Sequence, residues 1–203
     1  MQKIKLSSPS DLAPIGLRER KRAETHARIQ AEAMRLFLER GFDATTLDDI
    51  AQAADVSRRS LFHYFASKEE IVFSTKADLP ARIEAAIATR PAEEPLLDMV
   101  ENALYDMAAQ YDWGQAREFA RLIHSTPALN AGDQAKYEHV ERVLARALAD
   151  RKGLPEPDMA CRVTATTAIG ILKLSTDAWL AGDDAGPDVF GRDAFAALRR
   201  VVG

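Results

Sequence analysis

The chain has 203 residues, of which 47% are hydrophobic and 29% are charged, a composition typical of a globular protein with a buried core. Its single cysteine, Cys161, excludes an intramolecular disulfide and a metal site built only of cysteines. Because the first 17 residues lack the apolar core of a signal peptide, and the apolar run over 163–172 is about half the length of a membrane span, we expect a cytoplasmic protein without membrane contact.

The net charge of −4 is divided unevenly along the chain. Residues 1–76 hold 13 Lys and Arg against 11 Asp and Glu, whereas residues 77–203 hold 14 against 20. This change of sign suggests that the first part contacts a polyanion and the second does not. The positive residues of the first part are clustered, at Arg18, Arg20, Lys21 and Arg22, and again at Arg58, Arg59 and Lys68.

Apolar residues recur at helical spacing along nearly the whole chain, and alternating strand patterns bounded by turns are absent. In the first helix Ile29, Ala33, Leu36 and Phe37 share one face, and Gly41 stands where that helix should end. Prolines and glycines separate the segments that follow. We predict an all-α protein with a flexible tail at 1–16 and later helices at 47–54, 58–65, 68–89, 96–112, 115–124, 127–151, 157–182 and 187–202.

Residues 46–56 predict a short helix followed by a tight turn. Thr46 and Asp49 have the spacing of a capping box at the start of this helix. Asp55 stands at the turn, where we expect a left-handed backbone, and Val56 can fill the turn from the inside. The predicted inner face of the helix is small and apolar and consists of Leu47, Ile50, Ala51 and Ala54.

A second short helix follows the turn, with Ser57 as its cap. We expect three of its apolar residues to face inward, namely Leu61, Phe62 and Phe65. The residues expected to face outward are Arg58, Arg59, Ser60 and His63. Two short helices joined by a tight turn, the second with an exposed basic face, have the layout of a helix-turn-helix, whose second helix enters the major groove of DNA.

The segment after the second helix predicts a contact with phosphate. Ser67 and Glu70 have the spacing of another capping box, which would open a new helix with free backbone N–H groups. Lys68 adds a positive charge at the same place. Free N–H groups, the positive end of the helix dipole and a lysine together suit a phosphate.

These residues together resemble the signature of the TetR family of regulators, over roughly the first 75 residues. The resemblance implies a three-helix DNA-binding domain at 17–70, a helical ligand-binding and dimerisation bundle at 71–203, and a homodimer formed through the last two helices. Asp55 departs from the glycine usual in the family, which could strain the turn slightly. A narrower similarity to mycofactocin regulators implies an acyl-CoA as an alternative effector. The matching residues are Thr46, Leu47, Ile50, Ala51, Ala54, Asp55, Val56, Ser57, Ser60, Leu61, Phe62, Tyr64, Phe65, Ser67, Lys68 and Glu69.

The resemblance also implies which residues touch DNA. It assigns phosphate contacts to Thr46, Tyr64 and Lys68, and groove-facing roles to Ser57, Arg58, Arg59, Ser60 and His63. The side-chain chemistry agrees, because arginine reads guanine in the major groove and hydroxyl groups suit phosphate. A plainer reading is also open, in which the two arginines solvate a helix face and His63 is a simple exposed histidine. The basic residues at 18–22 could lie along the DNA backbone or minor groove, or could begin a solvated helix.

The second part of the chain is rich in bulky apolar and aromatic residues. Most should form plain core, which any helical bundle needs, but some could line a cavity for an apolar or amphipathic molecule. Tyr111, Trp113 and His124 are the best candidates because each has a polar tip that can orient a ligand. The full candidate set is Leu104, Met107, Tyr111, Trp113, Phe119, Ile123, His124 and Trp179.

An apolar seam in the last two predicted helices suits a symmetric interface, although the same seam could be buried within the monomer. A dimer would also carry two linked DNA-binding domains, which together bind DNA more tightly than one domain binds a single half-site. The seam mixes small and large residues and consists of Ala168, Gly170, Ile171, Leu174, Ser175, Phe195, Leu198 and Val202.

The sequence does not predict an enzyme, a metal site or a cofactor. Its four histidines include no pair at metal-ligand spacing, and it has neither a Gly-rich phosphate loop nor a Gly-x-Ser-x-Gly elbow. A protein-interaction module without DNA binding is the alternative, which the basic face of residues 57–68 argues against. We expect a repressor that binds an operator in double-stranded DNA and releases it when an effector tilts the predicted 68–89 helix.

Overall fold

The computed structural model describes residues 16–109, 113–182 and 186–202, and every regular element in these ranges is an α-helix, as predicted. Of the predicted 1–16 tail it describes only Gly16. No helix in the described ranges is both long and apolar enough to cross a membrane. The ten helices of these ranges are α1 (Leu17–Arg40), α2 (Leu47–Ala53), α3 (Arg58–Phe62), α4 (Lys68–Ser74), α5 (Leu79–Ala88), α6 (Leu96–Ala108), α7 (Trp113–Ser125), α8 (Pro127–Arg151), α9 (Met159–Ala181) and α10 (Pro187–Val202).

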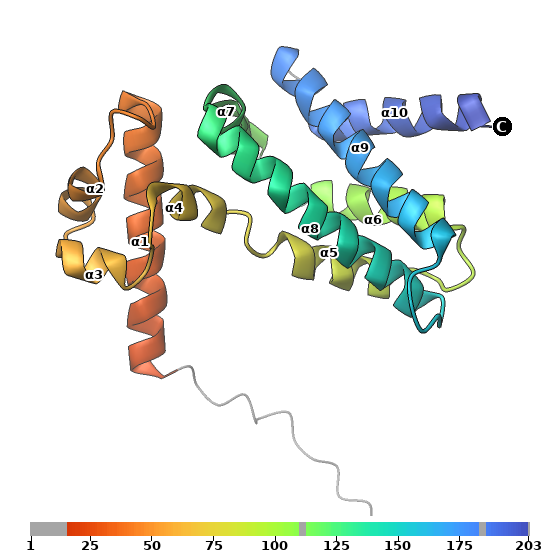
Figure 1. Cartoon of the computed structure of the whole chain (residues 1–203), viewed down its shortest axis with the longest axis horizontal. Coiled ribbons are helices and arrows are strands. Elements are labelled where there is room, and N and C mark those ends of the chain that lie inside the picture. The colour runs from red at the N-terminus through yellow and green to blue at the C-terminus, as the bar shows by residue number, and fades with distance from the viewer. Residues whose placement is uncertain (1–15, 110–112, 183–185, 203) are drawn as a thin grey trace, which may run out of the picture.

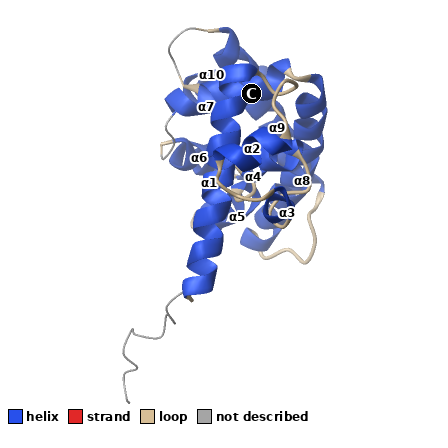
Figure 2. Cartoon of the chain, turned by 90° about the vertical axis from the view of Figure 1, so that its left-hand side faces the viewer, coloured by secondary structure: helices blue, strands red, loops and turns tan. Residues whose placement is uncertain are grey.

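The helices form two groups along an elongated molecule (Figure 1). Helices α1 to α4 lie at one end, and the long helices α8 and α9 run through a bundle with α5, α6 and α10 at the other. Helix α7 contacts α1 on one side and α8 on the other, and so joins the two groups. Figure 2 faces the first end and shows α2 and α3 in front of the rest of the molecule.

The first apolar core lies beneath α1 to α4. Helix α1 contributes the predicted face of Ile29, Ala33, Leu36 and Phe37, all buried, and ends at Gly41, whose φ of 87° favours glycine. The same core also contains Ile123 of α7 and Leu129 of α8. Because these two residues come from the bundle, α7 and α8 anchor the first group of helices to the second.

The second apolar core fills the bundle. Its largest buried members include Ile83, Ile87, Met99, Leu144 and Phe195, which come from α5, α6, α8 and α10, and α9 adds small residues such as Ala165 and Ala168. Burying a large apolar side chain contributes roughly 1.5–3 kcal/mol, so this core dominates the stability of the bundle.

The prediction of one helix over 68–89 is wrong, because the structure has two helices, α4 and α5, separated by residues 75–78. The N–H groups of residues 75–77 bond to carbonyls three residues earlier instead of four, which tightens the chain into a turn. Pro80 lies in the first turn of α5, where it lacks the N–H that a continuous helix would need. The helical spacing of apolar residues continues across the break, and it masked the signal that Pro80 gave.

The other predicted boundaries differ from the observed ones by a few residues at most. Helices α8 and α10 agree with the predicted ranges at both ends. Helix α3 is shorter than predicted, because His63 and Tyr64 already bond to carbonyls three residues earlier. The buried Phe65 therefore follows the helix rather than ending it.

Candidate nucleic-acid interface and bundle cavity

The first turn of α2 forms the capping box that the sequence predicts. The Thr46 hydroxyl accepts a hydrogen bond from the Asp49 N–H (3.1 Å), and the Asp49 carboxylate accepts one from the Thr46 N–H (2.9 Å). The Thr46 hydroxyl also donates to the same carboxylate. The pKa of Asp49 lies below its ordinary value because its carboxylate accepts these two hydrogen bonds, of which the one from the hydroxyl has the larger effect. The Thr46 hydroxyl is thus committed to the cap, and its contact with phosphate stays a prediction.

The turn between α2 and α3 has the predicted left-handed residue. Asp55 has a φ of 49°, a conformation in which a non-glycine residue is strained by roughly 1 kcal/mol. The Val56 N–H donates to the Ala51 carbonyl (3.0 Å), and the Arg28 guanidinium of α1 donates to the Ala54 carbonyl (2.9 Å). Arg28 therefore holds the turn against α1, a role that the sequence reading missed.

Helix α3 begins at the predicted cap and exposes the predicted basic face. Ser57 accepts a hydrogen bond from the Ser60 N–H (3.0 Å), and the two serine hydroxyls lie 2.8 Å apart. The side chains of Arg58, Arg59 and His63 are exposed, and Ser60 is half-buried. The predicted division between an inner and an outer face is therefore confirmed for these polar residues.

The prediction that Phe62 faces inward is wrong. Leu61 and Phe65 are buried, but Phe62 is 47% exposed, and the Arg58 guanidinium lies 5.7 Å from the centroid of its ring. Phe62 stands four residues after Arg58, so helical geometry places both on the outer face. That spacing could have revealed Phe62 as a residue of the outer surface.

The two neighbouring arginines of α3 have different surroundings. An Arg58 Nη1 lies 2.8 Å from a carboxylate oxygen of Asp48 on α2, with both side chains mostly exposed. An exposed ion pair of this kind contributes about 0–1 kcal/mol, so it orients Arg58 without fixing it. Among the residues that the structure describes, Arg59 has no ion-pair or hydrogen-bond partner.

Lys68 has a structural role that the sequence reading did not anticipate. Its ammonium donates to the carbonyls of Phe42 (2.7 Å) and Thr45 (2.8 Å) and lies 4.5 Å from the centroid of the Phe42 ring. Lys68 thereby holds the α1–α2 loop against the start of α4. An ammonium has three N–H donors, so one is left for the predicted phosphate contact.

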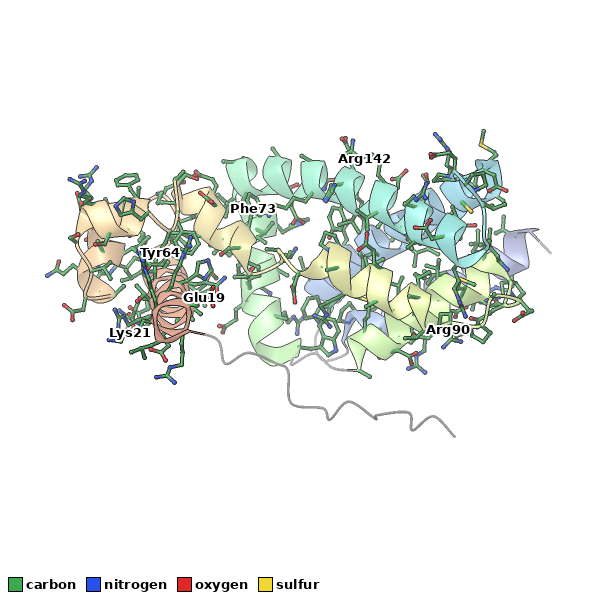
Figure 3. The ribbon with its side chains drawn as sticks, turned by 90° about the horizontal axis from the view of Figure 1, so that it is seen from below. Glu19, Lys21, Tyr64, Phe73, Arg90 and Arg142 are labelled. Atoms are coloured by element: carbon green, nitrogen blue, oxygen red, sulfur yellow. The ribbon has the colours of Figure 1, made fainter. Side chains whose placement is uncertain are left out.

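The second predicted capping box forms only in part. The Ser67 hydroxyl accepts a hydrogen bond from the Glu70 N–H (3.2 Å), as predicted, but the Glu70 carboxylate accepts one from the N–H of Ala66 rather than of Ser67. Tyr64 is half-buried, and its ring meets that of His26 on α1 edge to face. Figure 3 shows Tyr64 beside α1. The candidate DNA-contacting residues thus gather on α2, α3 and the start of α4.

A cavity of about 360 Å³ lies within the bundle. Helices α5 to α10 and the α4–α5 linker supply its walls, which are mostly apolar and aromatic. The rings of Trp113 and Trp179 meet there edge to face, with their centroids 5.6 Å apart. Five predicted ligand residues line this cavity, namely Leu104, Met107, Trp113, Phe119 and Trp179.

The other three predicted ligand residues are not among the described residues that line this cavity. Ile123 is buried in the first core, because α7 leaves the cavity before this turn and continues toward α1. His124 is exposed and, with Ile123, borders a second cavity of about 110 Å³. Tyr111 lies outside the described residues.

The sequence reading missed the polar residues of the larger cavity. Tyr105 of α6 and Tyr137 of α8 line it, and burial raises the pKa of both phenols above the ordinary value, so both are neutral hydroxyl groups. Lys76, Asp133 and Lys136 line it where the α4–α5 linker meets α8. The sequence could have revealed two of them. Asp133 and Lys136 stand at helical spacing with the buried Val140 and Leu144, which places them on the inner face of α8. Within the described ranges, His, Cys, Asp and Glu form no cluster able to hold a metal ion.

Comparisons with known proteins agree with this architecture. Residues 29–79 match the family described as bacterial regulatory proteins of the tetR family, and residues 94–203 match the family described as the MftR C-terminal domain. The transcriptional regulator TcmR of Streptomyces glaucescens is 33% identical over 151 residues, which cover 70% of this chain and 67% of TcmR. The putative mycofactocin biosynthesis regulator MftR of Mycobacterium tuberculosis is 29% identical over 186 residues, covering 91% and 92% of the two chains.

A solved structure supports the same fold. The crystal structure of a putative TetR-family regulator from Syntrophomonas wolfei superposes with a TM-score of 0.66 at 16% identity, over 90% of this chain and 97% of its own. The matched families and relatives are transcriptional regulators rather than enzymes. The helix-turn-helix at one end, the helical bundle at the other and these matches lead to one assignment: the chain belongs to the TetR family of transcriptional regulators.

Proposed function

We propose that this regulator is a repressor that binds its operator as a homodimer and releases it when a small apolar or amphipathic molecule occupies the bundle cavity. One observation carries the proposal. The same chain exposes a basic helix, α3, at one end and has a largely apolar cavity at the other, and α7 contributes residues both to the cavity wall and to the core beneath α3.

On this proposal α3 lies in the major groove. Arg59 has a guanidinium available for guanine, and Arg58 can exchange its exposed ion pair with Asp48 for a base or phosphate. Phe62 adds an apolar contact of the kind that suits a thymine methyl group. Ser57, Ser60 and His63 complete the groove-facing set, and Thr46, Tyr64 and Lys68 flank it as phosphate contacts.

The proposed dimer uses the exposed face of α9 together with α10. Most of the predicted seam is buried within the monomer, because Ala168, Ile171, Ser175 and Phe195 pack inside their own bundle, and Leu198 is half-buried against it. The side chain of Val202 is not among those described. The apolar face left for a partner consists of Met159, Val163, Gly170 and Leu174, which helical spacing places on one side of α9.

Effector binding acts on DNA through its different affinity for two arrangements of the dimer. The proposed signal passes from the cavity wall to α4 and α1 rather than along a single 68–89 helix. Lys76 of the α4–α5 linker belongs to that wall, and Phe73 of α4 packs against α8 and the first core.

The proposal is tested by recovering the genomic fragments that the protein retains and measuring binding to them by fluorescence anisotropy. We expect Arg58→Ala to weaken binding to a retained fragment by about 1–3 kcal/mol and to relax the preference at one base position. Random duplex of equal length is the control. Equal losses on both duplexes would remove Arg58 from base reading, and retention of no fragment by the wild-type chain would refute DNA binding.

Native mass spectrometry of the protein as purified tests the effector half of the proposal. A bound molecule of apolar or amphipathic character, an acyl-CoA included, should weaken binding to the recovered operator when it is added back. A bound molecule that strengthens operator binding would instead make it a co-repressor and would contradict release.

A further inference from the structure

One wall of the bundle cavity carries more positive than negative charge. Lys76 and Asp133 form an ion pair there (Nζ to Oδ1, 3.1 Å), and the Asp133 side chain is only 13% exposed. Lys136 lines the same wall, one helical turn after Asp133. Within the part of the chain that the structure describes, Lys136 forms no ion pair, and this wall therefore holds two ammonium groups against one carboxylate.

The partners of Lys136 are neutral groups of α4. Its ammonium donates to the Phe73 carbonyl (3.1 Å) and lies 4.0 Å from the centroid of the Phe73 ring. Burial lowers the pKa of Lys136, which reports the cost of holding an ammonium in apolar surroundings. Asp133, already paired with Lys76, compensates this charge only in part.

The other titratable groups of the lining do not remove the imbalance. Asp188 belongs to α10, and its carboxylate lies 3.9 Å from Arg192 of the same helix. Tyr105 and Tyr137 are neutral phenols, and His139 can add only positive charge. A ligand that brings a negative group to Lys136 would complete this wall.

We propose that the effector is an apolar anion, an aromatic or aliphatic body that carries a carboxylate or a similar anionic group, and that this group binds between Lys76 and Lys136. The inference rests on the proposed function, because it names the ligand class of the same cavity. The aromatic wall around Trp113 and Trp179 would cover the apolar body.

Lys136 also ties the cavity to the DNA-binding end. Phe73 packs so closely on α8 that a Cβ at Gly132 would lie 2.6 Å from its ring, and Lys136 holds its carbonyl. Figure 3 shows Phe73 between α4 and α8. The neighbouring Ser74 hydroxyl accepts a hydrogen bond from Gln30 of α1 (2.8 Å). An anion that draws Lys136 away from Phe73 would therefore loosen α4 from α8 and shift α1 with it.

The test uses two fluorescent probes that share their rings and differ in charge. Anilinonaphthalene sulfonate is an apolar anion, and N-phenylnaphthylamine is the same ring system without the sulfonate. Both are titrated into the wild-type protein, and Ala116→Phe, which fills the cavity, should abolish the binding of both. This variant reports whether the probes occupy the cavity.

Lys136→Met is the decisive variant, because methionine keeps a long side chain and removes the charge. We expect the dissociation constant of the anionic probe to rise about tenfold and that of the neutral probe to change less than twofold. Arg142→Met is the matched control, since Arg142 lies on the same helix, does not line the cavity and points away from the bundle in Figure 3. Lys76→Met, at the linker, gives a second variant should Lys136→Met not fold.

Each outcome bears on the inference. Selective loss of the anionic probe in Lys136→Met or Lys76→Met, with Arg142→Met unchanged, supports it. Equal loss of both probes, or no loss of either, overturns the anionic ligand while an apolar cavity ligand still stands. Failure of both probes to bind the wild-type cavity would overturn the proposed effector site itself, and this inference with it.

Discussion

Arg58 of α3, which we propose as a DNA contact, has an acidic neighbour that could both orient it and compete with DNA. Asp48 holds Arg58 in an exposed ion pair, and Arg58 in turn covers the ring of Phe62. The ion pair limits the rotamers of Arg58 before DNA arrives. It also places a carboxylate on the surface that we propose meets DNA, where its charge would repel phosphate.

Replacing that carboxylate tests which effect dominates. We expect Asp48→Asn to raise the affinity for random duplex severalfold, because one repulsive charge disappears and Arg58 becomes available to phosphate. Anisotropy titrations at two salt concentrations measure the change, and Asp193→Asn, an exposed aspartate of α10, is the matched control. An unchanged or lower affinity in Asp48→Asn would mean that orienting Arg58 outweighs the repulsion.

Lys68 serves the fold as well as the proposed DNA contact, so its loss should have two effects. We expect Lys68→Ala to lower the free energy of unfolding by about 1–3 kcal/mol, since two carbonyls lose a charged donor. It should also weaken binding to operator and random duplex equally and reduce the slope of log affinity against log salt by about one. Urea unfolding and anisotropy measure the two effects, and a stability loss with an unchanged salt slope would leave Lys68 a structural residue only.

At the scale of single elements, the sequence predicts what local interactions determine. The caps at Thr46 and Ser57 and the left-handed Asp55 were predicted because each depends on residues no more than five apart. The break between α4 and α5 was missed because apolar residues keep their helical spacing through it. The outward position of Phe62 was missed because hydrophobicity was given more weight than the face of the helix.

The connection between α5 and α6 depends on a charged group that acid should neutralise. The Arg90 guanidinium forms two hydrogen bonds to the Glu94 carboxylate (2.8 and 2.7 Å), Asn102 adds a third, and the Glu94 side chain is only 12% exposed. Lys152, the residue that follows α8, donates to the backbone carbonyls of Ala92 and Glu94. The pKa of Glu94 lies below its ordinary value, mainly because Arg90 donates hydrogen bonds to its carboxylate.

This lowered pKa predicts how a Glu94→Gln variant depends on pH. A carboxylate with a lowered pKa in the folded state stabilises the protein above its unfolded pKa of about 4.3, and this contribution disappears as the pH falls through the folded value. We expect Glu94→Gln to be about 1–2 kcal/mol less stable than wild type near neutral pH, with the gap closing in acid as the wild-type carboxyl takes up its proton. Urea unfolding near neutrality and at roughly one pH unit below the unfolded pKa measures both gaps, and equal gaps would contradict the assignment.

At the scale of the whole molecule, the sequence predicts a bundle and a set of candidate ligand residues but not which of them border the cavity. Bulky apolar and aromatic character marked the candidate ligand residues, and five of them do line the cavity. It cannot tell an inner residue that borders a void from one that packs in a core, which is why Ile123 was placed in the wrong group. The Lys76–Asp133–Lys136 wall joins segments about sixty positions apart, and only the packing of α8 beside the linker brings them together.

The proposed dimer also belongs to this scale. Met159 and Leu174 are 73% and 65% exposed, and Gly170 between them has open space above it, so a partner helix can approach closely. An apolar stripe on a long helix costs free energy in water, and a second copy of the same stripe would cover it about a twofold axis. Such an axis would hold two α3 helices at a fixed separation, as half-sites about 34 Å apart require.

Leu174→Glu tests this arrangement, because symmetry would bring two like charges together at the interface. We expect the variant to be monomeric in light scattering at concentrations where wild type is dimeric, with its cavity still able to bind the neutral probe. Operator affinity should fall at least tenfold, since a monomer binds one half-site without the gain in affinity that two linked DNA-binding domains have. Leu38→Glu makes the same change on an exposed part of α1 and should stay dimeric. A dimeric Leu174→Glu would place the interface on another face, and the separation of the two α3 helices would then have to be set by different contacts.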